Sequence, residues 1–258
     1  MDVIDHGRAL GETAEIRGLR QQTESVLALV AEAAATARPE GEPTEVRPLV
    51  GLAALIGELR RLEPQVRRSS WVMQPQYAYD PEDPGIELTR QARSRGVDDR
   101  LITRPATLRT HPLLPSIFPH ALVGPVFLRA MVIDDRLALI GGPDDAFGNR
   151  VSWRTTSREI VDAVLALWHD TAAHCRPVLE PHQQPPLTLR QLDVARLLCV
   201  GEKDKAIARL LDLSARTVER EVSAILRSLG ASSRTEAVLL MRGRGVNGGW
   251  SDHDGAEG

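Results

Sequence analysis

Hydrophobic side chains recur at helical spacing near the start of the chain. Residues 15–37 contain no proline, and apolar or small side chains alternate there at three and four residues, as in a heptad repeat. These positions are Ile16, Leu19, Thr23, Val26, Val30, Ala33 and Ala37. Two interpretations stay open, a dimerising coiled coil and an amphipathic helix that lies on its own domain. We treat residues 1–37 as one N-terminal helical segment.

The pattern then alternates between helical and strand periods. Residues 38–48 are rich in proline, glycine and charge, which predicts a linker. Residues 49–176 are expected to form a mixed α/β domain. Its predicted elements are a helix at 49–68, a strand at 69–73, a helix at 86–95 that ends at Gly96, a strand at 97–103, a hairpin at 127–142 that turns at Asp134-Asp135-Arg136, and a helix at 157–175.

A second proline-rich stretch, residues 177–186, predicts another linker, and the composition changes after it. Thr188 and Gln191 form a capping box, while Ser214 and Ser233 are N-cap candidates for later helices. Residues 187–243 are therefore predicted to form an all-α domain of four helices. Residues 244–258 are expected to be a disordered tail. The fold class is thus α+β with two domains.

Charge separates these two domains. Residues 186–245 carry 11 Lys and Arg against 7 Asp and Glu, whereas residues 1–185 carry 21 against 25. The C-terminal domain is therefore suited to a polyanion. The 2 cysteines are too few for a disulfide framework, and no apolar run approaches the roughly 20 residues that span a bilayer. Because the N-terminus also lacks the apolar core of a secretory signal, we expect a cytoplasmic protein that does not contact membranes.

The C-terminal sequence resembles the LuxR-type (GerE-like) DNA-binding domain over nearly its whole length. The resemblance rests on the run from Leu187 to Ala237, including Thr188, Gly201, Lys205, Ser214, Thr217, Val218, Gly230, Ser233 and Glu236. It implies a helix-turn-helix whose second helix reads DNA. Three departures stand out: Glu221 replaces the His or Asn common in the family, Ser228 replaces a common Lys, and Asp212 replaces a glycine usual in the turn.

Helical spacing assigns the expected contacts with double-stranded DNA. If Val218, Val222 and Ile225 are buried, the opposite face of their helix meets the major groove. The predicted base-reading residues are Thr217, Arg220, Glu221 and Ala224. The predicted phosphate contacts are Lys203, Lys205, Arg216, Arg227 and Arg234.

The predicted hairpin resembles that of phospholipase-D-like domains, whose signature is H-x-K-x4-D. Phe127 stands at the His position, Arg129 at the Lys position and Asp134 at the Asp position. Because phenylalanine cannot form a phosphohistidine, this degenerate phosphodiesterase motif predicts no catalytic residue. The resemblance, which extends to the sensor part of TrmB-type regulators, implies an inactive domain that senses a ligand or a partner.

Other candidate residues carry weaker signals. His169 and His174 lie on different helix faces, so we expect no metal site and no cofactor. His111 and His120 lie in a proline-rich loop and are expected to be exposed, with contact to a ligand as the alternative. Trp71, Phe127 and Trp153 are expected to pack in the core, with a pocket lining as the alternative.

The sequence therefore predicts a DNA-binding transcriptional regulator that is not an enzyme. We expect it to dimerise through residues 233–242, with Ala237, Val238 and Met241 at the interface, and through the heptad segment. RNA polymerase and an unidentified small molecule are further candidate partners. The alternative is a phosphodiesterase or nuclease-like domain fused to a DNA-targeting module. In a third interpretation, the N-terminal domain binds only proteins, and a pocket of a few hundred cubic ångströms under the hairpin would favour sensing instead.

Overall fold

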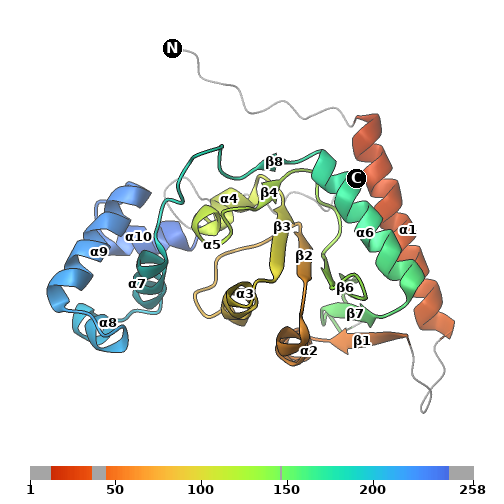
Figure 1. Ribbon diagram of the computed structural model, residues 1–258, viewed down its shortest axis with the longest axis horizontal. Helices are drawn as coiled ribbons and strands as arrows, with labels where there is room; N and C mark the ends of the chain where they lie inside the picture. Colours follow the sequence, from red (N-terminus) through yellow and green to blue (C-terminus); the bar gives the residue numbers. More distant parts are fainter. Residues whose placement is uncertain (1–12, 37–44, 146, 244–258) are drawn as a thin grey trace.

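A mixed eight-stranded sheet forms the centre of the N-terminal region in the computed structural model, which describes residues 13–36, 45–145 and 147–243 (Figure 1). The strands lie in the order β1-β7-β6-β5-β2-β3-β4-β8. Their bounds are Val46–Val50 (β1), Ser69–Gln74 (β2), Asp98–Thr103 (β3), Leu122–Val123 (β4), Ala130–Ile133 (β5), Leu137–Gly141 (β6), Val151–Thr155 (β7) and Arg176–Pro177 (β8). Only β2, β3 and β4 pair in parallel.

Two long helices cover one face of this sheet. Helices α1 (Ala14–Thr36) and α6 (Arg158–Ala173) lie side by side in Figure 1. Leu19, Val26 and Val30 of α1 are buried in the same cluster as Val164 and Trp168 of α6. The heptad pattern therefore describes an amphipathic helix packed on its own domain. The coiled-coil alternative is wrong for these side chains, while Ala37 lies outside the described residues.

The opposite face of the sheet carries α2 (Leu52–Leu62), followed by a short 3-10 turn at Glu63–Gln65, and α3 (Pro84–Ser94). Leu62 of α2 and Ala92 of α3 pack with Ile133 and Leu139 of the hairpin. The predicted hairpin is confirmed, with Val132 opposite Ala138 across β5 and β6. Its turn is tight because Asp134 and Asp135 both adopt left-handed backbone conformations, with φ of 52° and 56°.

The predicted linker at 38–48 is wrong at its end, because Val46–Pro48 belong to β1. Pro48 is compatible with this strand because β1 is at the sheet edge and pairs only with β7. The predicted helix start at residue 49 is wrong for the same reason. Pro177 was likewise expected in the second linker but pairs with Leu122 in β8 and β4.

A buried carboxylate fixes α2 against the sheet edge. Glu58 is 6% exposed and binds Arg47 of β1 at 2.6 Å and Arg154 of β7 at 2.9 Å, as well as Arg61. Hydrogen bonds from Arg61, opposed by burial and aided by Arg47, lower the pKa of Glu58 to about 2. Ion pairs thus hold this face of α2 against β1 and β7. The spacing of hydrophobic residues in the sequence could not predict these contacts.

Four helices form the C-terminal domain, as predicted. They are α7 (Leu189–Cys199), α8 (Asp204–Leu210), α9 (Ala215–Leu229) and α10 (Arg234–Met241). Thr188 and Gln191 make the reciprocal capping-box contacts, and Gly230 ends α9 with φ of 64°. These local signals explain why the helix limits agree with the sequence to within a few residues.

The two regions share a hydrophobic core. Tyr79 and Leu113, from the N-terminal region, are buried with Cys199 and Met241 of the C-terminal helices. Short helices α4 (Thr107–Thr110) and α5 (Leu114–Ile117) lie at this junction. The Leu187 amide donates to Ser116 Oγ at 3.0 Å. The C-terminal domain is therefore docked on the sheet domain.

His111 lies inside this junction, so the expectation that it is exposed is wrong. Its side chain is 0% exposed, and its ring lies 4.9 Å from that of Tyr77 and 5.2 Å from that of Tyr79, between ring centroids. Neither ring nitrogen has a hydrogen-bond partner among the described residues. Burial lowers the pKa of His111 to about 4. Two tyrosine rings thus lie against a neutral imidazole here.

Acid should therefore weaken the fold through His111. Its pKa is lower in the folded than in the unfolded protein, so its contribution is present above pH 6.5 and is lost as the pH falls toward 4. Between pH 7 and pH 5 this group should lower the free energy of unfolding by about 2 kcal/mol. Urea unfolding of wild type and His111→Leu measures the difference, with exposed His120→Leu as the control. Parallel pH profiles for wild type and His111→Leu would contradict this assignment.

Candidate nucleic-acid interface

Helices α8 and α9 form a helix-turn-helix unit. Asp212 occupies the turn with a φ of 53°, a conformation that aspartate adopts more readily than most side chains. Ser214 then caps α9, because its hydroxyl accepts the Thr217 amide at 3.0 Å. The turn and the cap together fix the angle at which α9 leaves α8.

The inner face of α9 anchors it to the rest of the domain. Val218, Val222 and Ile225 are buried with residues of α7, α8 and α10. The opposite face is exposed and carries mainly polar side chains. Its residues are Arg216, Glu219, Arg220, Ser223 and Arg227. A row of three arginines along an exposed helix is suited to binding phosphates and the edges of guanine bases.

Two of the predicted base-reading residues lie differently from expectation. Glu221 is only 8% exposed and accepts a hydrogen bond from Gln191 Nε2 of α7 at 3.1 Å. Its other oxygen lies 3.2 Å from the Arg220 guanidinium. The prediction that Glu221 faces the groove is therefore wrong. Ala224 is half-buried, one step off the centre of the exposed face.

Arg220 and Thr217 keep positions compatible with base reading. The Arg220 side chain is 69% exposed, and its pairing with Glu221 limits the directions in which it can extend. Thr217 is half-buried and its hydroxyl contacts that of Ser214 at 2.8 Å. Ser223 was not among the predicted base-reading residues, yet it lies on the exposed face and does not pack in the core. Its position three residues after Arg220 on the same helix could have predicted this exposure.

Four of the predicted phosphate contacts are exposed basic side chains, namely Lys203, Lys205, Arg216 and Arg227. No ion pair engages them within the described part of the chain. Arg234 differs, because it pairs with Asp204 at 2.7 Å. That pair links the starts of α8 and α10, so Arg234 has a structural contact besides any role on DNA.

Helix α10 does not present the side chains expected at a dimer interface. Ala237 and Met241 are 0% exposed and belong to the core shared with Tyr79. The expectation that they pack against a second copy is therefore wrong. Leu239, 44% exposed, and the half-buried Val238 remain on the outside of this helix.

The residues of the hairpin motif do not form one site. Arg129 directly precedes β5 and Asp134 directly follows it, so the two lie at opposite ends of the strand. Phe127 is half-buried with the Arg20 guanidinium of α1 stacked 4.3 Å from its ring centroid. Arg129 lines a cavity on the other side of the sheet, against α2 and α3.

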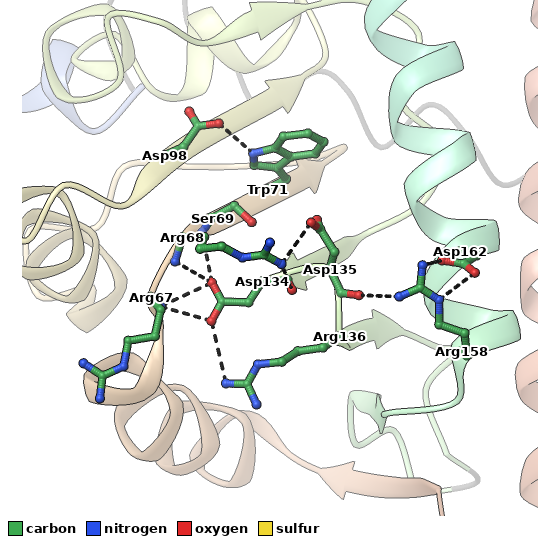
Figure 2. A network of polar contacts seen from close by, with 10 residues as sticks. All are labelled: Arg67, Arg68, Ser69, Trp71, Asp98, Asp134, Asp135, Arg136, Arg158 and Asp162. Carbon is green, nitrogen blue, oxygen red and sulfur yellow. Dashed lines mark hydrogen bonds and ion pairs between the residues drawn. The ribbon is translucent and has the colours of Figure 1, made fainter.

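Asp134 has a structural role that Figure 2 makes visible. Its carboxylate accepts the backbone amides of Arg67, Arg68 and Ser69 at distances between 2.7 and 3.2 Å. Burial raises the pKa of Asp134, but these three backbone hydrogen bonds outweigh it and the pKa is lowered. The aspartate thereby ties the β5–β6 turn to the start of β2, and it is 4% exposed.

The remaining candidates are packed side chains. Trp71 stacks on Trp168 with 4.6 Å between ring centroids, and Trp71 and Trp153 pack against the main core. No group of three or more potential metal ligands lies together among the residues described. Within the same residues, no helix combines the length and apolar character needed to cross a membrane.

The C-terminal part of the chain is similar to known regulatory proteins. The transcriptional regulatory protein YdfI of Bacillus subtilis is 42% identical over 60 residues, which are 23% of this chain and 28% of YdfI. The glycerol metabolism activator of Pseudomonas putida is 42% identical over 59 residues, 23% of this chain and 27% of that protein. The chain thus matches less than a third of the length of these relatives.

For the N-terminal region the comparison is with solved structures. The structure of the phospholipase D family member Nuc from Salmonella typhimurium is similar over 51% of this chain and 96% of the Nuc chain, with 12% identity and a TM-score of 0.41.

The C-terminal part of the chain also matches a family model. Residues 185–241 match the family described as "Bacterial regulatory proteins, luxR family". This match covers the helices from α7 to α10, so the part of the chain that carries α8 and α9 is similar to that family.

Proposed function

We propose that this protein is a sequence-specific DNA-binding transcriptional regulator of the cytoplasm. The observation that carries the proposal is the exposed arginine face of α9, presented by a capped helix-turn-helix. Arg220 lies nearest the centre of that face and is the candidate for bidentate contact with guanine. Lys203, Lys205, Arg216 and Arg227 supply phosphate contacts.

Two-fold symmetry is part of the proposal. One helix reads only a few base pairs, and a homodimer doubles the length of the recognised site. The exposed Leu239 of α10 is an available apolar contact for a second copy. Contact with RNA polymerase stays a prediction, since no described feature favours a particular surface for it.

Selection of bound DNA from a random pool tests the proposal. The full chain, incubated with random duplexes at physiological salt, should enrich a consensus made of two inverted half-sites. Arg216→Ala combined with Arg220→Ala and Arg227→Ala should enrich nothing. A pool that stays random with the wild-type protein would contradict sequence-specific binding. A consensus without dyad symmetry would contradict the homodimer alone.

The N-terminal domain is proposed to lack hydrolytic activity. Phe127 offers no nucleophile, and the carboxylate of Asp134 is occupied by three backbone amides. Phe127→His should therefore remain inactive toward bis(p-nitrophenyl) phosphate, because Arg129 and Asp134 lie at opposite ends of β5. Turnover by the wild type that disappears in Arg129→Gln would support the phosphodiesterase alternative and overturn this proposal.

A further inference from the structure

An apolar cavity lies between α2, α3 and the sheet. Its volume is about 600 Å³, within the range of small-molecule sites. Leu55 and Leu59 of α2 form one wall, while Val72, Met131 and Leu139 of the strands form the floor. Such a surface gains free energy when an apolar group displaces water from it.

One end of the cavity is positively charged. The Arg129 side chain is half-buried there and makes no hydrogen bond or ion pair among the described residues, and Arg150 lines the same end. Burial lowers the pKa of Arg129, and the neighbouring Arg150 lowers it further, while Asp144 acts in the opposite direction. A half-buried guanidinium without a counter-ion is costly, and a bidentate anion would relieve that cost.

The backbone is shaped around Arg129. A Cβ atom at Gly141 would lie 2.6 Å from Arg129 Nε and 2.9 Å from Nη2, so a larger residue there would displace the guanidinium from its present position. Five acidic side chains line the cavity elsewhere, and none of them is among the charged groups that shift the pKa of Arg129. Glu63 pairs with Arg95. Asp99 pairs with Arg93 at 2.7 Å, and Asp83 accepts the Tyr77 hydroxyl at 3.1 Å. Charge complementarity therefore favours an anion at the arginine end.

The wall formed by α3 and the segment before it is shared with the DNA-binding domain. Leu88 and Ala92 of α3 face the cavity, whereas Arg90 of the same helix pairs with Asp193 of α7 at 3.1 Å. Two residues apart, Tyr77 lines the cavity and Tyr79 is buried in the core of the C-terminal helices. A molecule that moves this wall must also move contacts of α7.

We propose that this cavity binds a small amphipathic anion, with its carboxylate or phosphate head on Arg129 and Arg150 and its apolar body over β2, β5 and β6. Through the shared wall, occupancy changes the affinity of the protein for DNA. This second part rests on the proposed function. The first part concerns the cavity alone and can be tested without DNA.

Calorimetry with the full chain tests the ligand site. The probes are decanoate, decyl phosphate and the uncharged decanol, each below its micellar concentration. Both anions should bind more tightly than decanol, and their ranking distinguishes a carboxylate from a phosphate head. Arg129→Gln should weaken the anions by about 10- to 100-fold and leave decanol unchanged. Arg67→Gln, an exposed arginine outside the cavity, is the matched control and should bind as wild type does.

Two results would overturn the site. One is equal affinity for decanoate and decanol in wild type and in Arg129→Gln. The other is the absence of heat for all three probes. Circular dichroism verifies that Arg129→Gln folds. If it does not fold, the test is repeated with Arg150→Gln, because Arg150 is exposed.

A second measurement addresses the coupling. Affinity for the selected DNA, measured with and without saturating decanoate, should change by about fivefold or more in wild type and not in Arg129→Gln. An unchanged affinity in wild type would overturn the coupling. A protein that binds no DNA under either condition would contradict the proposed function, and calorimetry would still decide the ligand site.

Discussion

Arg220→Ala is expected to lower the affinity for the selected DNA sequence by about 10- to 100-fold, equivalent to about 1–3 kcal/mol, with little loss on random DNA. The Arg220 side chain is 69% exposed on the outer face of α9, and Glu221 at 3.2 Å restrains it. Truncation removes a direct contact with a base edge and keeps the inner face of the helix intact. Fluorescence anisotropy with labelled duplexes measures both affinities.

Lys205→Ala is the contrasting variant in this experiment. Lys205 is exposed on α8 and has no described ion pair, so its contact with DNA should be with phosphate. Its removal should weaken binding to both kinds of DNA alike and reduce the slope of log affinity against log salt by about one. If Arg220→Ala also weakened both equally, Arg220 would not be the residue that reads the sequence.

Asp134→Ala is expected to reduce the free energy of unfolding by about 3 kcal/mol or more. The change leaves the backbone amides of Arg67, Arg68 and Ser69 without their acceptor, and the Ser69 hydrogen bond is buried. Because the pKa of Asp134 is lowered in the folded protein, this contribution is present at neutral pH and is lost as the pH falls from the pKa of the unfolded state toward the lower pKa of the folded state. Urea unfolding at pH 7 measures the change.

Asp135→Ala provides a matched control for that measurement. Asp135 is the next residue of the turn, with a φ of 56° against 52° for Asp134, so both alanines suffer the same backbone strain. The Asp135 side chain is 42% exposed and pairs only with exposed Arg68. Asp135→Ala should therefore lower the free energy of unfolding by less than about 1 kcal/mol beyond the effect of that strain. Equal losses for the two variants would contradict the role given to the Asp134 carboxylate.

Local signals made most of the fold predictable. Three of the four helices of the C-terminal domain carry N-caps, at Thr188, Ser214 and Ser233, and Gly230 ends α9. The β5–β6 hairpin was predictable for the same reason, since its turn residues lie between two apolar runs. Strand β1 was not predicted because a proline such as Pro48 is typical of a linker. Pro48 is compatible with the sheet because β1 lies at its edge.

The site was less predictable because the positions of its side chains depend on contacts with residues far away in the sequence. Glu221 turns inward because Gln191, thirty residues earlier, donates to it. His111 is buried because Tyr77 and Tyr79 surround it, and Met241 is buried because the sheet domain docks against α10. Helical phase alone placed Arg220 on the exposed face, since no long-range contact competes there.

Competition between the selected DNA and a scrambled duplex tests the central claim most directly. In anisotropy titrations of the full chain at 150 mM salt, the selected sequence should bind about a thousandfold more tightly, or better, and the ratio should fall for Arg220→Ala. Equal affinities for the two duplexes, weakening together as salt rises, would mean that α9 contacts phosphates only and would contradict sequence-specific regulation.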